Sequence, residues 1–496
     1  MKTSPASTAM RSRHKKSIGS AIGRGIEIAR VLRRKLGPKI VLNSKEEIES
    51  HSFDALRHHR GYALPEKGFP PDLVVTPSTT KQLTILLEVA RQFGIPLTPR
   101  GAGTGLMGGA VALRRPGIVI DFRKMNKVLK VNKKDQSVVV QPGATMGSVN
   151  RVLKSSRLML GHDPWTRDYA TVGGSISTNG MGYYGGRYGS MGEQVLGLKG
   201  VLANGTKIQT PAVPYSSTGF DLRRLFIGTE GTLGLLIEAT LRCFPIPKAQ
   251  EIMGFSFPTF EIAFKTALRM RDEDLSPASM DIMCEGYAVP CEFYVLFAGS
   301  PDAVKASVKR CLRLFSSLGG TRLESGKARS YWKERHNIAD MYVQGVSRSP
   351  LSSFREDKSF DFVHVGLAAS KIIPFKRKIS ELARRRRITI EEYGTWIKPE
   401  LFNFNFTRER GVPAENLRRT VDDSMKLAIK LGGTIEYCHG SGFRLAGLLP
   451  LQHGEGLEIM RRIKQELDPQ MILNPGKLGL SMSRMRRQTR SRRSSR

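Results

Sequence analysis

Glycines are concentrated in residues 171–241, in a pattern that suits close contact between backbone and ligand. Glycine is used where a chain must reach positive φ or bring its backbone against another group. Small hydroxyl residues and Asn179 alternate with the glycines, and apolar runs at 195–203 and 233–241 separate them. A flexible linker would lack those runs. The pattern therefore predicts backbone packed around a large, flat, polar ligand. The glycines are Gly173, Gly174, Gly180, Gly182, Gly185, Gly186, Gly189, Gly192, Gly228, Gly231 and Gly234.

A shorter glycine-rich segment, residues 99–110, contains Gly103-x-Gly105-x-x-Gly108 directly after a predicted strand. This spacing matches the dinucleotide-binding fingerprint, in which a helix opens at the motif and its N-terminus holds the pyrophosphate. Here a loop punctuated by Gly and Pro follows, and then a strand ending near Asp121, so a nicotinamide-type Rossmann site is disfavoured. Successive backbone N–H groups in such a turn can still form an anion-binding nest.

Short strands and helices alternate around these glycines. Residues 73–76, 79–93 and 95–99 predict a strand, a helix capped by Ser78 or Thr79, and a second strand. Residues 45–59 are expected to form a helix that carries His51, His58 and His59 at the surface. The remaining predicted elements are a strand at 138–142 and helices at 28–36, 146–155, 260–270, 302–318 and 459–467, with strands at 293–298 and 360–365.

Length and composition limit the class of protein. A chain of 496 residues predicts two or three domains, and it has no apolar run long enough to span a bilayer. The five cysteines are scattered and odd in number, so we expect no disulfide framework and a reducing compartment.

The chain is strongly basic, with a formal net charge of +35. The first 26 residues contain no acid, and the tail after residue 482 has seven arginines and no acid. Such a charge favours anionic surfaces and polymers in general, and three explanations stay open: a membrane surface, nonspecific contact with nucleic acid, or an organism with a basic proteome. The N-terminus fits either a mitochondrial transit peptide or a disordered basic arm. The arginine-rich tail is predicted to be disordered.

Four segments carry a resemblance to a known superfamily: PRGAGTGLMGGA at 99–110, the glycine-rich run at 172–205, DLRRLFIGTEGTLGLLIEATL at 221–241 and ILNPGKLGL at 472–480. Together they resemble the PCMH-type FAD-binding domain of vanillyl-alcohol-oxidase-type flavoproteins, and within it the D-lactate dehydrogenase and glycolate oxidase group. The resemblance implies an α+β fold. The implied units are a basic arm (1–27), a two-subdomain FAD-binding domain (28–247, core 70–247), an α+β cap or substrate domain (248–448), a C-terminal segment returning to the FAD domain (449–480) and the tail (481–496).

By resemblance, the two glycine-rich segments bind FAD. The loop at 99–110 would cradle the pyrophosphate, Asp163-Pro164 resembles a turn beside the flavin, and Ile237 would face the adenine side. The loop has no histidine of the kind that links flavin covalently in some relatives, so noncovalent FAD is implied. The residues implied in cofactor binding are Arg100, Gly101, Ala102, Gly103, Thr104, Gly105, Asp163, Thr171, Gly173, Gly174, Ser177, Asn179, Gly180, Gly182, Tyr188, Glu230, Gly231, Ile237 and Asn474.

Two further residues match catalytic positions of the family. Oxidation of a 2-hydroxy acid needs a base for the hydroxyl proton, a cation for the carboxylate, and a flavin to accept the hydride. His439 aligns with the histidine of the family's Glu-His-Gly-x-Gly motif and is expected to be the base. Arg335 matches an arginine of the cap and is the candidate for the carboxylate, because a guanidinium can bond both oxygens.

The chain departs from the family at its metal-binding positions. Many D-2-hydroxy-acid members bind a divalent metal through His-x-Gly-Asp-Gly-Asn-x-His and through the glutamate before the catalytic histidine. Here those positions are Trp396, Asn403 and Cys438, so we expect no metal. A bound metal would polarise the substrate hydroxyl. Without it, either cationic side chains alone must do so, or the protein acts on another substrate.

Three functions remain open at this point. The first is an FAD-dependent dehydrogenase of a D-2-hydroxy acid such as lactate or glycolate, which passes electrons to a quinone, cytochrome or flavoprotein. The second is an alkylglycerone-phosphate-synthase-like transferase, and the third is a flavin-binding protein without catalysis. Expected partners include the small hydroxy acid, the electron acceptor, an anionic membrane surface and a second copy of the chain, but no specific nucleic acid. The expected location is the cytoplasm or the inner face of a membrane, with mitochondria as a further alternative.

Overall fold

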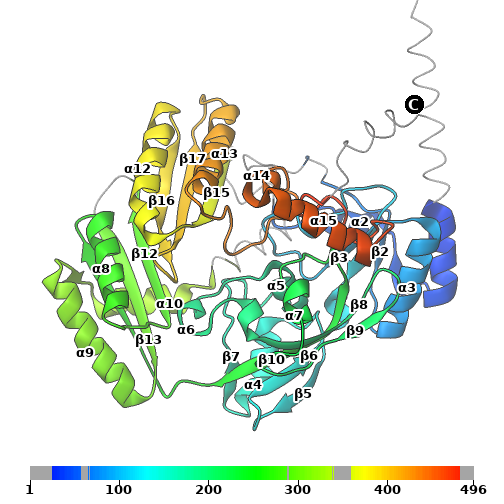
Figure 1. Ribbon diagram of the computed structural model, residues 1–496, viewed down its shortest axis with the longest axis horizontal. Helices are drawn as coiled ribbons and strands as arrows, with labels where there is room; N and C mark the ends of the chain where they lie inside the picture. The colour runs from blue at the N-terminus through cyan, green and yellow to red at the C-terminus, as the bar shows by residue number, and fades with distance from the viewer. Residues whose placement is uncertain are drawn as a thin grey trace, which may run out of the picture.

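The computed structural model describes residues 25–56, 65, 68–286, 290–337, 339 and 359–480. The acid-free N-terminal segment up to residue 24, His58, His59 and the arginine-rich tail lie outside these residues. Three β-sheets with helices packed on them form the described chain, which confirms the α+β class. In Figure 1 the largest sheet and its helices lie at the left, and the two smaller sheets lie at the right.

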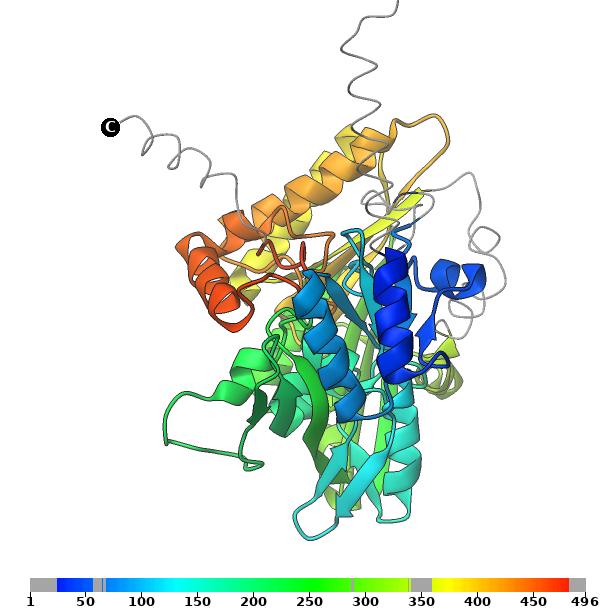
Figure 2. The same ribbon diagram turned by 90° about the vertical axis from the view of Figure 1, so that its right-hand side faces the viewer.

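The first sheet has four strands in the order β1-β2-β4-β3, and β2, β4 and β3 run parallel. Its helix α3 begins after Thr79, which forms a capping box with Gln82, and ends at Gly94 in the left-handed conformation. The apolar face of α3 packs beside the helix of residues 25–36 (Figure 2). The elements are β1 (Val41–Leu42), α2 (Lys45–Ser50), β2 (Leu73–Val75), α3 (Thr80–Phe93), β3 (Leu97–Arg100) and β4 (Ile118–Asp121).

The second sheet is antiparallel, in the order β5-β6-β10-β8-β9, with β7 also paired to β10. Apolar residues alternate along β10, so one face of this strand meets the core formed with α4 and α5. The elements are β5 (Val128–Asn132), β6 (Ser137–Val140), α4 (Met146–Lys154), β7 (Leu158–Leu160), α5 (Val172–Thr178), α6 (Gly185–Tyr188), β8 (Val195–Val201), β9 (Lys207–Gln209), α7 (Leu222–Phe226) and β10 (Leu235–Pro245).

The third sheet has seven strands in the order β14-β11-β13-β12-β16-β17-β15. Helices α8, α9, α12 and α13 pack on it around a phenylalanine-rich core that includes Phe255, Phe293 and Phe404. The elements are β11 (Ala249–Phe257), α8 (Phe260–Asp272), β12 (Ser279–Glu285), β13 (Cys291–Gly299), α9 (Pro301–Ser317), β14 (Thr321–Arg322), α10 (Ser325–Glu334), β15 (Ser359–Gly366), α12 (Ala369–Arg385), β16 (Thr389–Trp396), β17 (Leu401–Arg408) and α13 (Ala414–Lys430).

The C-terminal segment lies against the first sheet. After α14 (Leu449–His453) and α15 (Glu455–Leu467), Leu473 forms a bridge with Leu97 of β3. The ammonium of Lys464, which is 1% exposed, donates to Asp468 and to the carbonyls of Thr232 and Leu473. The segment is therefore held against the glycine-rich chain by buried polar contacts as well as by apolar packing.

Two local expectations were wrong. The helix predicted at 45–59 ends at Ser50, and His51 is buried, with Nε2 3.3 Å from Asp121 rather than at the surface. Cys284 and Cys291 form a disulfide because β12 and β13 bring their Cα atoms within 4.4 Å. The scattered spacing of the cysteines gave no sign of this hairpin. Within the part of the chain that the structure describes, none of the helices has the length and apolar content to cross a bilayer.

Candidate active site

A large pocket runs between the glycine-rich loops and the C-terminal loop of residues 438–442. Its empty space, counting the open mouth, is about 1240 Å³. Among the predicted residues, its lining contains Arg100, Gly101, Ala102, Gly103, Thr104, Gly105, Thr171, Gly173, Gly174, Ser177, Gly180, Glu230, Gly231 and His439. The fold thus brings together segments more than 300 residues apart.

The loop after β3 is built around the Arg100 side chain. The guanidinium donates to the carbonyls of Phe53 at 2.7 Å, Ser50 at 3.4 Å and Ala110 at 3.5 Å. Gly103 has a φ of +71°, and a Cβ there would lie 2.3 Å from the guanidinium. No helix opens at the Gly-x-Gly-x-x-Gly motif, and the chain continues as a loop into β4, as predicted. Arg100 therefore holds the shape of this turn and also contributes to the pocket lining.

The glycines that line the pocket serve two different purposes. A Cβ at Gly173 would lie 2.7 Å from Cβ of Pro142, so glycine is needed there for packing within the protein. By contrast, a Cβ at Gly105 would meet nothing within 4 Å, and at Gly174 only the Thr171 hydroxyl at 3.2 Å. Since the protein leaves space at these two positions, their lack of a side chain keeps the pocket open for a ligand.

Glu230 joins the glycine-rich chain to the loop that carries His439. Its Oε1 accepts the backbone N–H groups of Ser441 at 2.7 Å and Gly442 at 2.9 Å. Its own carbonyl accepts the side-chain amide of Asn474 at 2.8 Å, and that amide also donates to Gly109. Burial raises the pKa of Glu230, and the two backbone donors oppose that shift. Glu230 and Asn474 therefore position three loops of the pocket wall.

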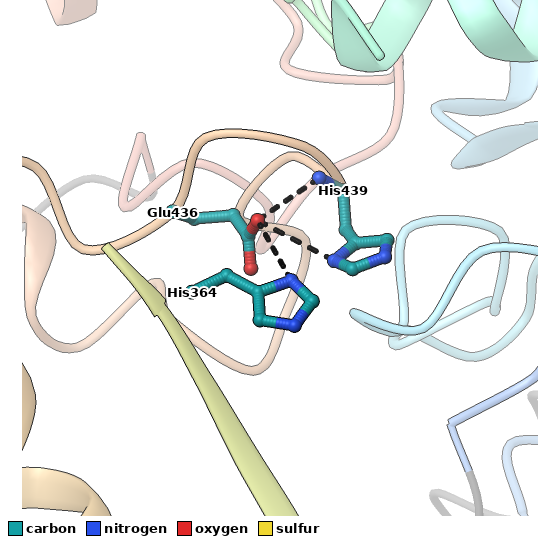
Figure 3. A group of neighbouring side chains, drawn as sticks. All are labelled: His364, Glu436 and His439. Atoms are coloured by element: carbon teal, nitrogen blue, oxygen red, sulfur yellow. Dashed lines mark hydrogen bonds and ion pairs between the residues drawn. The ribbon is translucent and has the colours of Figure 1, made fainter. Parts of the chain in front are cut away.

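His439 lies in the pocket wall beside Cys438. Its Nδ1 is 3.4 Å from Oε1 of Glu436, the oxygen that also accepts the backbone N–H groups of Tyr437, Cys438 and His439 (Figure 3). Burial would lower the pKa of His439, but its interactions with Cys438 and Glu436 raise it to about 10. The neighbouring Glu436 carboxylate therefore favours the protonated ring in the ligand-free protein.

Arg335 and Asp163 form an ion pair outside the pocket lining. Arg335 follows α10, and its Nε and Nη2 donate to Oδ2 of Asp163 at 3.1 and 3.0 Å. The guanidinium also lies 3.9 Å from the ring of Trp332, and Nε2 of His336 is 3.3 Å from Oδ1 of Asp163. Besides its contacts with Trp332, Arg335 is thus bound to a residue of the glycine-rich half of the chain.

Other predicted residues lie behind the pocket wall. Asn179 ends α5 in the left-handed conformation, and its side chain accepts the N–H of Gly192 at 2.9 Å. A Cβ at Gly182 would lie 2.6 Å from the backbone nitrogen of Asp163, so glycine lets these two segments touch. These residues set the course of the loops, and the structure places neither of them in the lining.

Tyr188 and Ile237 are also outside the lining. The Tyr188 ring stacks on Phe244 with centroids 4.0 Å apart, and Ile237 is 7% exposed within the core of the first sheet. Their side chains support β10, whose first residues, Leu235 and Leu236, do line the pocket.

Sequence reasoning missed several residues of the site. His162, Trp165 and Thr166 line the pocket, and burial lowers the pKa of His162 to about 4, so its ring is neutral. Glu436 and His364 lie beside His439 but belong to no motif that the sequence analysis used. A histidine within the predicted strand 360–365, where Asp361 is the other polar residue, was the one available signal for His364.

The fold and the pocket define a flavin-binding protein of the PCMH type. Residues 71–210 match the FAD binding domain family, and residues 246–478 match the family of FAD linked oxidases, C-terminal domain. The chain belongs to these FAD-linked oxidases, and FAD is the cofactor of its glycine-rich domain.

Relatives and solved structures agree with this class. The chain is 28% identical to the glycolate oxidase subunit GlcD of Bacillus subtilis, over 86% of this chain and 92% of that protein. It is also 28% identical to the mitochondrial D-lactate dehydrogenase [cytochrome] 1 of Saccharomyces cerevisiae, over 90% and 78%. p-Cresol methylhydroxylase shares the fold with a TM-score of 0.75, 17% identity and coverage of 92% and 97%. An alkyldihydroxyacetonephosphate synthase shares it with a TM-score of 0.72, 18% identity and coverage of 90% and 84%.

The residues present fit FAD. Glycine-rich backbone lines the pocket, and Gly105 and Gly174 carry no side chain there, so backbone can approach a flat ring or a diphosphate. His439 lies in the same lining, so a substrate held against bound flavin would be within reach of an imidazole.

Proposed function

We propose that the protein oxidises a D-2-hydroxy acid of the lactate or glycolate type. The observation that carries the proposal is His439, with Glu436 behind it, in the wall of the FAD pocket. The names of the relatives support this substrate class, and the wider family assignment supports oxidation. We further propose that FAD is bound without a covalent link, because the loop at 99–110 contains no histidine.

FAD, when bound in the pocket, would supply the hydride acceptor for the proposed reaction. Nδ1 of His439 faces the Glu436 carboxylate, so the opposite nitrogen, Nε2, is the atom proposed to accept the hydroxyl proton (Figure 3). The ring must be neutral for this step, and loss of water around it when flavin and substrate bind would favour the neutral form. Glu436 keeps Nδ1 as the protonated nitrogen, which leaves the lone pair of Nε2 for the substrate.

Arg335 is proposed to hold the substrate carboxylate from the cap side. Its guanidinium has five N–H donors, and two of its nitrogens are committed to Asp163 and one to the carbonyl of Trp332. Binding of substrate therefore requires Arg335 to share these partners or to exchange Asp163 for the substrate.

The proposal is tested by an anaerobic absorption spectrum of the FAD-loaded protein before and after D-lactate, glycolate and L-lactate. We expect D-lactate or glycolate to bleach the flavin band. His439→Asn should keep bound FAD, yet its band should bleach at least about 100-fold more slowly, the scale expected for loss of a general base. Bleaching at the wild-type rate in this variant would remove His439 from the base role.

A transferase is the second candidate, because an alkyldihydroxyacetonephosphate synthase, also called alkylglycerone-phosphate synthase, shares the fold. The strongly basic composition would suit a phosphate-bearing substrate. A flavin band that no hydroxy acid bleaches, but that changes with an acyl-glycerone phosphate, would favour this function. A band that responds to neither would favour a flavin-binding protein without catalysis.

The electron acceptor is proposed to be a cytochrome, with a quinone or a flavoprotein as alternatives, since one relative is named as a cytochrome-linked enzyme. A basic surface would attract an acidic acceptor or an anionic membrane. Turnover measured with each acceptor at low and high salt distinguishes a cytochrome, a quinone and a flavoprotein, because salt screening weakens long-range attraction.

We also propose that the chain associates with a second copy of itself. Sedimentation would test this proposal.

A further inference from the structure

Three side chains beside the pocket form a compact group of metal-binding type. His364 comes from β15, and Glu436 and His439 come from the loop after α13 (Figure 3). Each offers one ligand atom, and these atoms lie within 4.8 Å of one another. Two imidazole nitrogens and one carboxylate oxygen are donors that Zn²⁺ and similar divalent transition ions accept, with a further position open for water or another ligand.

The distances suit an ion after small movements. Tetrahedral coordination with bonds of about 2.0–2.1 Å places ligand atoms roughly 3.3–3.5 Å apart. Nδ1 of His439 is already 3.4 Å from Oε1 of Glu436, and Nδ1 of His364 is 3.9 Å from the same oxygen. Among the described residues, Nδ1 of His439 is buried without a hydrogen bond of good geometry. A coordination bond would satisfy this atom.

The surroundings hold the three groups in place. Three backbone N–H groups fix the Glu436 carboxylate, and the two imidazole rings stack with centroids 4.9 Å apart. Tyr437 stacks on His364, and Phe362 lies 5.5 Å from His439. Ligands held in this way need little reordering when an ion binds. The ion could enter from the pocket, since His439 is part of its wall.

The strand register explains why positions 396, 403 and 438 did not reveal this group. His364 of β15 pairs directly with Asn403 of β17. His364 therefore lies beside position 403 on the neighbouring strand, and Glu436 lies two residues before Cys438. The expectation of no metal rests on positions 396, 403 and 438, and none of these belongs to the group.

We propose that His364, Glu436 and His439 bind one divalent transition ion of the Zn²⁺ type. An ion on Nδ1 of His439 leaves a neutral ring with a proton on Nε2 and no free lone pair, so the bound ion and the proposed base role of His439 exclude each other. The ion should therefore inhibit turnover reversibly. This inhibition rests on the proposed function, whereas the binding of the ion does not.

The test uses the full-length, FAD-loaded protein after treatment with EDTA. Zn²⁺ is titrated by calorimetry, bound zinc is counted by elemental analysis after gel filtration, and Mg²⁺ serves as the comparison ion. We expect one equivalent of zinc in the wild type and affinity at least about 10-fold weaker in His364→Asn. His453→Asn, a histidine of α14 outside the cluster, should bind as the wild type does.

The possible outcomes distinguish failure of the ion site from failure of the proposed oxidation of a hydroxy acid. Failure of Zn²⁺ to bind saturably, or equal affinity in His364→Asn and the wild type, overturns the ion site. Turnover that falls in step with zinc occupancy and recovers with EDTA supports inhibition, provided that His364→Asn loses the effect. If zinc binds at this site and turnover rises or stays unchanged, the inhibition is overturned. If hydroxy acids never reduce the flavin, with or without zinc, the proposed function fails while the binding result still stands.

Discussion

Individual residues of the pocket have different structural roles: some shape the loops or allow close packing, and others leave space for a ligand. Arg100 lines the pocket, and its guanidinium also donates to the protein's own carbonyls, at Phe53 among others, which shapes the loop. Gly173 keeps two segments of chain in contact, whereas Gly174 leaves space in the pocket. The same residue type at adjacent positions thus serves packing in one case and ligand access in the other.

Gly174→Leu should therefore abolish FAD retention while the protein stays folded, because the new side chain would enter the pocket. Gly173→Ala should instead lower the stability of the apoprotein by about 1–3 kcal/mol, since its Cβ would overlap Pro142. The flavin-to-protein absorbance ratio and the melting temperature of the apoprotein measure the two effects. Full flavin loading of Gly174→Leu would contradict its place in the pocket.

At the scale of elements, α15 holds the C-terminal segment against the glycine-rich chain. Lys464 and Asp468 form a buried pair, and Asp468 also accepts the backbone N–H groups of Ile472 and Leu473. Burial lowers the pKa of Lys464, and the Asp468 carboxylate opposes that shift. This pair fixes the turn from which Asn474 reaches the loops of the pocket.

Lys464→Met should lower the free energy of unfolding by about 3–5 kcal/mol, because Asp468 would remain as a buried charge without its partner. Chemical denaturation measures the change. Arg462→Met, on the exposed face of the same helix, is the matched control and should alter stability by no more than about 0.5 kcal/mol. Equal changes in the free energy of unfolding for the two substitutions would show that the buried pair contributes no more to stability than an exposed residue.

At the scale of the whole molecule, the ion pair between Asp163 and Arg335 ties the cap to the FAD-binding half. Burial alone would raise the pKa of Asp163, but the neighbouring His336 and the charge of Arg335 outweigh it and hold the pKa below its ordinary value. Tyr183 adds a hydrogen bond to the carbonyl of Arg335 at 3.1 Å. The two halves are therefore joined by charge as well as by packing.

The contribution of Asp163 to stability should be fully present above its unfolded pKa of about 3.9 and should be lost as the pH falls through the lower folded value. Asp163→Asn should thus be less stable than the wild type at pH 7, and the difference should shrink below about pH 4. Unfolding midpoints measured between pH 7 and pH 3 provide the test. A difference that stays constant with pH would exclude this linkage.

The sequence by itself determined the α+β class, the glycine-rich loops, the FAD assignment and the position of His439, because these features lie in continuous stretches of chain. The domain boundaries and the roles of the site residues remain predictions. Only the tertiary structure decided which groups meet: Arg335 with Asp163, and His364 with Glu436 and His439. Such contacts depend on strand register and on segments up to 172 residues apart, which local spacing does not encode.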